Sequence, residues 1–214
     1  MNCWALIPVK APGLGKTRLA PALDARTREA LVSGMLRHVL DTVSACRSVQ
    51  RVCVLGPVRP NLGRGIMRFD DPGPDLNGAL ESTMAAITAA GPERILVLPA
   101  DLPCLGVADV DRLARLPADT LGIAPDRHRT GTNALSLPLP DAIWFPFSFG
   151  QDSFSTHCEN ATNRGLTVET ILSCGLEKDI DDPLDLADAV RILRRACNPA
   201  IGGRPRPEGR KRSI

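Results

Sequence analysis

The stretch CWALIPVKAPGLGKTRL, residues 3–19, contains the features that decide the fold. Its first part, residues 3–9, is a short apolar run that predicts a buried β-strand. A loop rich in glycine and proline, residues 11–17, follows directly after Lys10. A glycine-rich loop at the end of a buried strand can surround phosphate groups with its backbone N–H groups. The stretch therefore predicts an α/β protein with an anion site at the end of its first strand.

Apolar runs and helical patterns alternate along the rest of the chain. The sequence predicts further strands at residues 51–55, 65–69, 94–98, 120–124, 133–137 and 167–172. It predicts helices at residues 27–45, 76–90, 107–116, 151–164 and 183–195. The alternation favours a three-layer α/β fold, in which helices cover a mostly parallel central sheet. Ligands of such sheets bind at the carboxyl ends of the strands.

The composition fits one domain with a basic tail. A chain of 214 residues with 43% apolar content can form one sizeable core, which we place in residues 1–197. Residues 198–214 are rich in proline and glycine, and we expect them to be disordered. This tail has five basic residues and one acid, so the rest of the chain carries a net charge of about −2. Because nucleic-acid binders usually concentrate positive charge on the folded surface, we expect no nucleic-acid partner.

The cysteine pattern and the hydropathy indicate a cytoplasmic protein. The seven cysteines form no C-x-x-C pair, and we find no secretory segment, which favours reduced thiols. No apolar run reaches the roughly 20 residues that a membrane-spanning helix needs. We therefore expect a cytoplasmic protein without a membrane partner.

Three cations lie in or beside the first loop. Lys10, Lys16 and Arg18 carry charge that matches a triphosphate, and Gly13 and Gly15 let the backbone approach it. The tripeptide at 15–17, GKT, fits the end of a P-loop, but that motif requires glycine where this chain has Lys10. A P-loop phosphotransferase and a solvated basic loop remain alternatives to a nucleotide site.

Three aspartates are candidates for a metal site. Asp101 follows the predicted strand 94–98 within the sequence PADLP. Asp179 and Asp181 are two residues apart, and in an extended segment such residues point the same way. Together the three carboxylates could hold magnesium, with phosphate oxygens completing its shell. The alternatives are a capping aspartate at Asp101 and an acidic helix N-terminus after Asp179.

A second anion site is predicted from two turns, TGTNAL at 130–135 and FGQDSF at 149–154. Gly150 and the helix start after it expose N–H donors, and Thr132 and Ser153 add hydroxyls. The alternatives are a hairpin turn, simple N-capping by Ser153 or Asp152, and a structural role for His157.

The dipeptide Asn77-Gly78 is a candidate for contacting a nucleobase. An asparagine amide can pair with a base edge, and Gly78 permits close approach. The alternative is an asparagine cap before the helix at 76–90.

The motifs PVK…GKTRL, LNGAL, PADLP, GTNAL, FGxxSFxxH and DID, in this order, resemble the guanylyltransferase family of deazaflavin coenzyme F(420) biosynthesis. The resemblance extends from about Cys3 to Asp188. It implies a single-domain nucleotidyltransferase fold similar to the GT-A glycosyltransferases. It also implies magnesium-dependent transfer of GMP from GTP to a three-carbon phospho-acid.

By motif position, the resemblance implies a role for each candidate residue. It assigns the phospho-acid to Thr132, Gly150 and Ser153, magnesium to Asp101, Asp179 and Asp181, the phosphates to the loop with Lys10, Gly13, Gly15, Lys16 and Arg18, and guanine to Asn77 and Gly78. The chain departs from the family pattern at Asp75 and at Gln151-Asp152.

The sequence leaves several points open. The acceptor candidates are 3-phospho-D-glycerate, phosphoenolpyruvate and 2-phospho-L-lactate, which share size and charge. A non-catalytic nucleotide-binding module remains an alternative to an enzyme. A homodimer and a downstream deazaflavin transferase are also left open as partners.

Overall fold

The computed structural model describes residues 2–59, 62–63, 65–70, 75–181 and 183–187. The predicted tail at 198–214 and Asp182 lie outside these residues. The strands are β1 (Cys3–Pro8), β2 (Arg51–Leu55), β3 (Met67–Phe69), β4 (Arg94–Val97), β5 (Thr120–Pro125), β6 (Thr132–Pro138) and β7 (Thr167–Thr170). The helices are the 3-10 helix η1 (Thr17–Leu19) and the α-helices α1 (Ala25–Ala45), α2 (Leu76–Thr88), α3 (Val107–Ala114) and α4 (Ser153–Thr162).

The seven strands form one mostly parallel sheet, as the sequence predicts. Their order is β3-β2-β1-β4-β6-β5-β7. Strands β3, β2, β1 and β4 are parallel to one another, and β7 is parallel to β5. Strand β6 is antiparallel to both of its neighbours, β4 and β5. The carboxyl ends of β1, β2 and β4 therefore lie at the same edge of the sheet.

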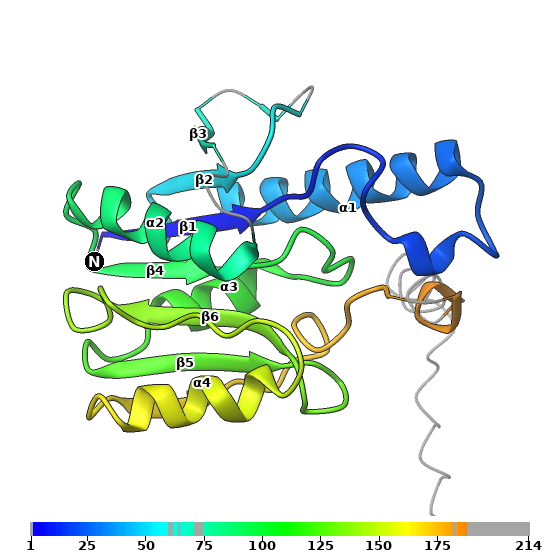
Figure 1. Cartoon of the computed structure of the whole chain (residues 1–214). Helices are drawn as coiled ribbons and strands as arrows, with labels where there is room; N and C mark the ends of the chain where they lie inside the picture. Colours follow the sequence, from blue (N-terminus) through cyan, green and yellow to red (C-terminus); the bar gives the residue numbers. More distant parts are fainter. Residues whose placement is uncertain (1, 60–61, 64, 71–74, 182, 188–214) are drawn as a thin grey trace, which may run out of the picture.

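Helices cover both faces of the sheet and complete the three layers (Figure 1). In β1, Cys3, Ala5 and Ile7 pack into one core cluster with residues of α1 and α3. The alternate residues Trp4 and Leu6 pack into the second cluster, with residues of α2 and α4. Because successive side chains of a strand point to opposite faces, β1 supplies both cores. This explains why its sequence is continuously apolar.

The element boundaries agree with the sequence prediction to within a few residues. One local feature differs. Helix η1 forms within the segment that follows the predicted loop, where a short 3-10 turn closes after Lys16. The predicted helix at 183–195 is described only at 183–187, which are helical, and its remainder lies outside the described residues.

The described residues bear on two expectations from the sequence, one about the cysteines and one about membrane-spanning helices. The six described cysteines, which are Cys3, Cys46, Cys53, Cys104, Cys158 and Cys174, are all free thiols. Burial raises the pKa of Cys3 to about 12, so that thiol stays protonated at neutral pH. Over the residues that the model describes, every helix is too short or too polar to cross a membrane.

Candidate active site

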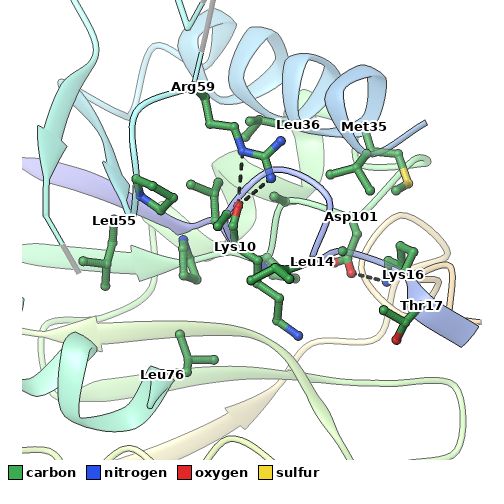
Figure 2. Close-up of a pocket in the computed structure, with 18 of the residues that line it drawn as sticks. Lys10, Leu14, Lys16, Thr17, Met35, Leu36, Leu55, Arg59, Leu76 and Asp101 are labelled. Atoms are coloured by element: carbon green, nitrogen blue, oxygen red, sulfur yellow. Dashed lines mark hydrogen bonds and ion pairs between the residues drawn. The ribbon is translucent and has the colours of Figure 1, made fainter. Parts of the chain in front are cut away.

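A cavity of about 790 Å³ lies at the carboxyl ends of β1 and β4 (Figure 2). Its wall includes Lys10 directly after β1, the Gly15–Arg18 part of the loop, and Asp101 after β4. Asp75, Leu76 and Ala79 at the start of α2 form another part of the wall. The cavity is therefore where a parallel sheet is expected to bind its ligand.

Lys16 joins two acidic segments that are distant in the sequence. Its ammonium donates hydrogen bonds to Asp101 Oδ2 and, at 2.9 Å, to Asp181 Oδ1. Figure 2 shows Lys16 and Asp101 pointing toward each other at the edge of the cavity. Arg18 adds a longer ion pair, 3.7 Å from its Nη1 to Asp181 Oδ2. The loop cations and the predicted metal carboxylates thus form one cluster.

The local backbone and packing place Lys16 in this cluster. Lys16 adopts a left-handed conformation, with φ 55° and ψ 43°, directly before η1. Such a conformation is costly for a residue with a side chain, so the surroundings must hold it. Leu19 of η1 packs with Met35 of α1 and with Ile180, which lies between the two downstream aspartates. This small apolar cluster brings the 179–181 segment against the loop.

The pKa values show how strongly these charges interact. Burial raises the pKa of Asp179 to about 6, and the nearby Asp101 and Asp181 carboxylates add to that shift. Burial alone would lower the pKa of Lys16, but Asp101 and Asp181 outweigh it and the pKa is raised. Burial opposes ionisation of Asp181 too, yet its hydrogen bond from Lys16 leaves its pKa lowered. The cluster therefore favours a bound positive charge.

The donor set suits a hard divalent cation. Asp101 and Asp181 already bind the same ammonium from two sides, and Asp179 is close enough for both to raise its pKa. Carboxylate oxygens are the ligands that magnesium prefers. As arranged in the described part of the chain, no three His, Cys, Asp or Glu side chains form a ready metal-binding group. Lys16 instead lies between Asp101 and Asp181, so these carboxylates would exchange an ammonium for a metal ion.

An ion pair between the buried Arg59 and the partly exposed Glu29 fixes the position of the first loop. Arg59 Nη1 lies 2.6 Å from Glu29 Oε1 of α1, and the guanidinium also donates hydrogen bonds to the carbonyl oxygen of Lys10. The other carboxylate oxygen of Glu29 accepts a hydrogen bond from the backbone N–H of Gly13, at 2.8 Å. The Arg59 side chain is only 3% exposed. The pair fixes both ends of the segment 10–13, and no periodicity or motif in the sequence indicates it.

One predicted acceptor residue, Thr132, contacts the buried His157 of α4. His157 is fully buried, and Thr132 Oγ1 lies 2.9 Å from its Nδ1. The backbone N–H of Ser148 donates to its Nε2, also at 2.9 Å. The imidazole packs edge-on against Phe149, with ring centroids 4.9 Å apart. Burial lowers the pKa of His157 to about 4, so the ring is neutral at physiological pH.

Asn77 connects α2 to the same turn. Its Oδ1 accepts from the backbone N–H of Phe149 at 2.8 Å, and its Nδ2 donates to the Phe149 carbonyl at 3.2 Å. The amide thus pairs with backbone in both directions. Asp75, not Asn77, is the N-cap of α2 and accepts from the Gly78 N–H. A contact between Asn77 and a nucleobase stays a prediction.

The start of α4 carries the two other acceptor candidates. Gly150 has φ 137°, a conformation that side chains rarely adopt. Ser153 is buried, and the N–H of Phe154 next to it donates to the carbonyl of Thr130, beside the Thr132 turn. Asp152 occupies the N-cap position with φ 54°, but its side chain makes no capping hydrogen bond. The capping alternative for this carboxylate is therefore wrong.

The structure sorts the predicted residues into two groups. Lys10, Gly15, Lys16, Arg18, Asp101 and Asp181 line the cavity. Thr132, Gly150 and Ser153 lie in a separate group around the β6 start and the α4 start, which Asn77 links to α2. The described residues that line the cavity do not include the other four candidates, which are Gly13, Asn77, Gly78 and Asp179. The backbone N–H of Gly13 donates to Glu29, and Asp179 is a half-buried member of the acidic cluster.

The chain has the α/β fold of the nucleotidyltransferases. A solved nucleotidyl transferase from Methanothermobacter thermautotrophicus has a similar fold, with a TM-score of 0.59 at 17% identity. The alignment covers 90% of this chain and 98% of that chain. At this identity the comparison supports the fold alone.

The chain belongs to the family described as "Guanylyl transferase CofC like", whose model matches residues 3–192. It is 36% identical over 193 residues to the phosphoenolpyruvate guanylyltransferase of Sphaerobacter thermophilus, covering 88% of this chain and 92% of that protein. It is 33% identical over 195 residues to the 2-phospho-L-lactate guanylyltransferase of Methanothermobacter thermautotrophicus, covering 89% and 85%. The protein is therefore an enzyme, a nucleotidyltransferase of the guanylyltransferase type.

Proposed function

We propose that this enzyme transfers GMP from GTP to the phosphate of a three-carbon phospho-acid, in the biosynthesis of coenzyme F(420) or a derivative. A phosphate oxygen of the acid attacks the α-phosphorus of GTP and forms a new P–O bond. The bond from the α-phosphorus to the β-phosphate oxygen breaks, and pyrophosphate leaves. The names of the relatives, one for phosphoenolpyruvate and one for 2-phospho-L-lactate, support an acid of this size.

The observation that carries the proposal is the Lys16 cluster at the edge of the cavity. Lys16 binds Asp101 and Asp181 there, while Lys10 and Arg18 line the same cavity. A triphosphate needs cations and backbone N–H groups, and a metal that bridges its oxygens needs carboxylates. The cavity brings three cations together with the carboxylates of Asp101 and Asp181, which favours a metal nucleotide as its ligand.

The chain's own residues would act mainly by position and charge. The acceptor phosphate is already an anionic nucleophile, so the reaction requires no strong general base. Lys10, Lys16 and Arg18 would hold the phosphates and stabilise the charge that develops on the leaving pyrophosphate. Asp101, Asp179 and Asp181 would hold magnesium, which supplies charge neutralisation at the phosphate oxygens when bound.

Thr132, Gly150 and Ser153 would hold the acceptor acid. The hydroxyls of Thr132 and Ser153 and the backbone at Gly150 are neutral donors, which bind an anion without neutralising it as a nucleophile. Asp152 is exposed at this turn and should repel a second anion. A hydroxylated acid can donate a hydrogen bond to that carboxylate, which favours 3-phospho-D-glycerate over phosphoenolpyruvate. Equal concentrations of the three acids in competition would test this preference, and a clear preference for phosphoenolpyruvate would contradict the Asp152 argument.

The reaction is tested by following pyrophosphate release with GTP, magnesium and each of the three acids in turn. We expect release only when GTP and an acid are both present, and much less release with ATP in place of GTP. Release of inorganic phosphate would instead support a P-loop phosphotransferase. GTP binding without turnover in any acid would support a non-catalytic nucleotide-binding module.

A further inference from the structure

The donor and acceptor roles in the two hydrogen bonds of His157 can be assigned from its partners. The backbone N–H of Ser148 can only donate, so Nε2 of His157 must accept that bond and carries no hydrogen. A neutral imidazole has one hydrogen, which must then be on Nδ1. Nδ1 lies 2.9 Å from Thr132 Oγ1, so the imidazole donates to the Thr132 oxygen. The backbone therefore selects the tautomer of a buried side chain.

This tautomer decides what Thr132 can offer to a ligand. A hydroxyl has one hydrogen to donate and lone pairs to accept with. Since the Thr132 oxygen accepts from His157, its hydrogen remains available to donate elsewhere. With the opposite tautomer, the Thr132 hydroxyl would donate to Nδ1 and would turn its lone pairs outward. An anion is attracted by the first arrangement and repelled by the second.

We propose that His157 is a positioning residue that directs the Thr132 hydroxyl toward an anionic oxygen of the acceptor acid. The inference rests on the proposed function, because it takes Thr132 to contact the acid. His157 itself stays behind Thr132, fully buried and packed between Phe145 and Phe149, with ring centroids 5.7 and 4.9 Å away.

The two hydrogen bonds of His157 require a neutral imidazole. Burial without a neighbouring carboxylate lowers the pKa of His157, and no charged partner offsets that effect in the described surroundings. A neutral imidazole has one donor, which matches the Thr132 oxygen, and one acceptor, which matches the Ser148 N–H. In a low-dielectric site, linked hydrogen bonds also polarise one another, which strengthens the Thr132 hydroxyl as a donor.

The tautomer can be measured directly on the unliganded wild-type protein. Long-range ¹H–¹⁵N correlation spectra distinguish the protonated ring nitrogen of a histidine from the unprotonated one. We expect His157 to be neutral at neutral pH with its hydrogen on Nδ1. His157→Gln identifies its signals, and His38 on α1, which contacts the carbonyl of Leu105, is an internal reference. A hydrogen on Nε2 would overturn the proposal, whatever the activity of the protein.

Kinetics test whether His157 acts through Thr132. His157→Gln is the sharpest variant, because its Oε1 can still accept from the Ser148 N–H while the donor to Thr132 is lost. We expect kcat/KM for the acid to fall about tenfold or more, with the KM for GTP nearly unchanged. Thr132→Val should show a similar loss. His38→Gln is the matched control and should behave like wild type.

The double variant separates positioning from general support of the fold. If His157 acts through Thr132, adding His157→Gln to Thr132→Val should cost little more in kcat/KM for the acid. Losses that multiply in the double variant, or an unchanged kcat/KM in His157→Gln, would overturn the proposal. A wild-type enzyme that turns over no acid would contradict the proposed function instead. The NMR measurement would then decide alone whether His157 sets the direction of the Thr132 hydroxyl.

Discussion

The ammonium of Lys16 donates a hydrogen bond of 2.9 Å to Asp181, a residue 165 positions further along the chain. This contact holds the loop at 11–17 against the acidic segment that follows β7. Asp101 accepts a hydrogen bond from the same ammonium. Lys16, in the loop after β1, therefore connects the segment after β4 with the segment at 179–181. The charge balance of the proposed site therefore depends on Lys16 in the ligand-free protein as well as during turnover.

Replacing Lys16 with alanine should lower both activity and stability. A lysine in a loop is expected to be exposed, yet the Lys16 side chain is only 9% exposed and has two carboxylate partners. Lys16→Ala leaves those carboxylates facing one another, which should reduce the free energy of unfolding by about 1–3 kcal/mol. Urea unfolding measures this change and pyrophosphate release measures the activity. Lys10→Ala, which removes an exposed cation, should leave stability within about 0.5 kcal/mol of wild type.

Two results would count against this account of Lys16. Wild-type turnover in Lys16→Ala would remove Lys16 from the site. An unchanged free energy of unfolding would show that its two ion pairs contribute no net stability.

Asp101→Asn should weaken the dependence of the enzyme on magnesium. Losing one of three carboxylates should raise the magnesium concentration for half-maximal pyrophosphate release and lower the maximal rate about tenfold or more. A magnesium titration of wild type and variant measures both quantities, and EDTA should abolish wild-type activity. Asp141→Asn changes an exposed carboxylate just beyond β6 and serves as the control. A wild-type magnesium titration curve for Asp101→Asn would show that Asp101 is not a metal ligand.

The ion pair of the buried Arg59 with the partly exposed Glu29 should affect GTP binding without contacting the acid. Arg59→Lys keeps the charge but cannot bind Glu29 and the Lys10 carbonyl with one planar group. A looser loop should raise the KM for GTP about five- to tenfold, which corresponds to the loss of about one hydrogen bond. Arg68→Lys, in the exposed pair with Asp70, is the matched control. An unchanged KM for GTP in Arg59→Lys would show that the pair does not position the loop.

His157 should make the wild-type protein sensitive to mild acid. Its pKa is about 4 in the folded state and about 6.5 when unfolded, so between these values the unfolded chain binds more protons. Stability is then fully present above about pH 6.5 and falls as the pH drops toward 4, by at most about 1.4 kcal/mol per pH unit. Urea unfolding of wild type and His157→Gln across this range isolates the effect, since other groups titrate in both. A constant stability difference between the two proteins would contradict the lowered pKa.

The sequence predicted the sheet and the positions of the phosphate and metal candidates because those signals are local. The apolar run of β1 faces two cores, and Asp101 comes shortly after the end of β4 at Val97, so the sequence indicates both the strand end and the candidate ligand. The spacing of Asp179 and Asp181 and the DID motif that contains them indicate these two residues. That they meet Lys16 depends on Ile180 packing against Leu19 and Met35, and these are ordinary apolar residues with no motif.

The remainder of the site depends on contacts between distant residues that carry no pattern. Glu29 lies within a helix whose apolar stripe faces elsewhere, and its partner Arg59 is 30 residues away. Asn77 resembles a cap in the sequence, but its amide binds the backbone of Phe149, 72 residues further on. His157 was singled out only by its place one turn after Ser153. Its contacts with Thr132 and Ser148 form because α4 packs on the edge of the sheet.

The central claim is that the α-phosphorus of GTP is the atom attacked, and ³¹P NMR tests it most directly. GTP and magnesium are incubated with the enzyme and each phospho-acid, and all phosphorus-containing products are identified. The account predicts one equivalent of pyrophosphate and one of a diphosphate that joins GMP to the acid. GDP with inorganic phosphate or a newly phosphorylated product would contradict it, and so would unchanged GTP with every acid.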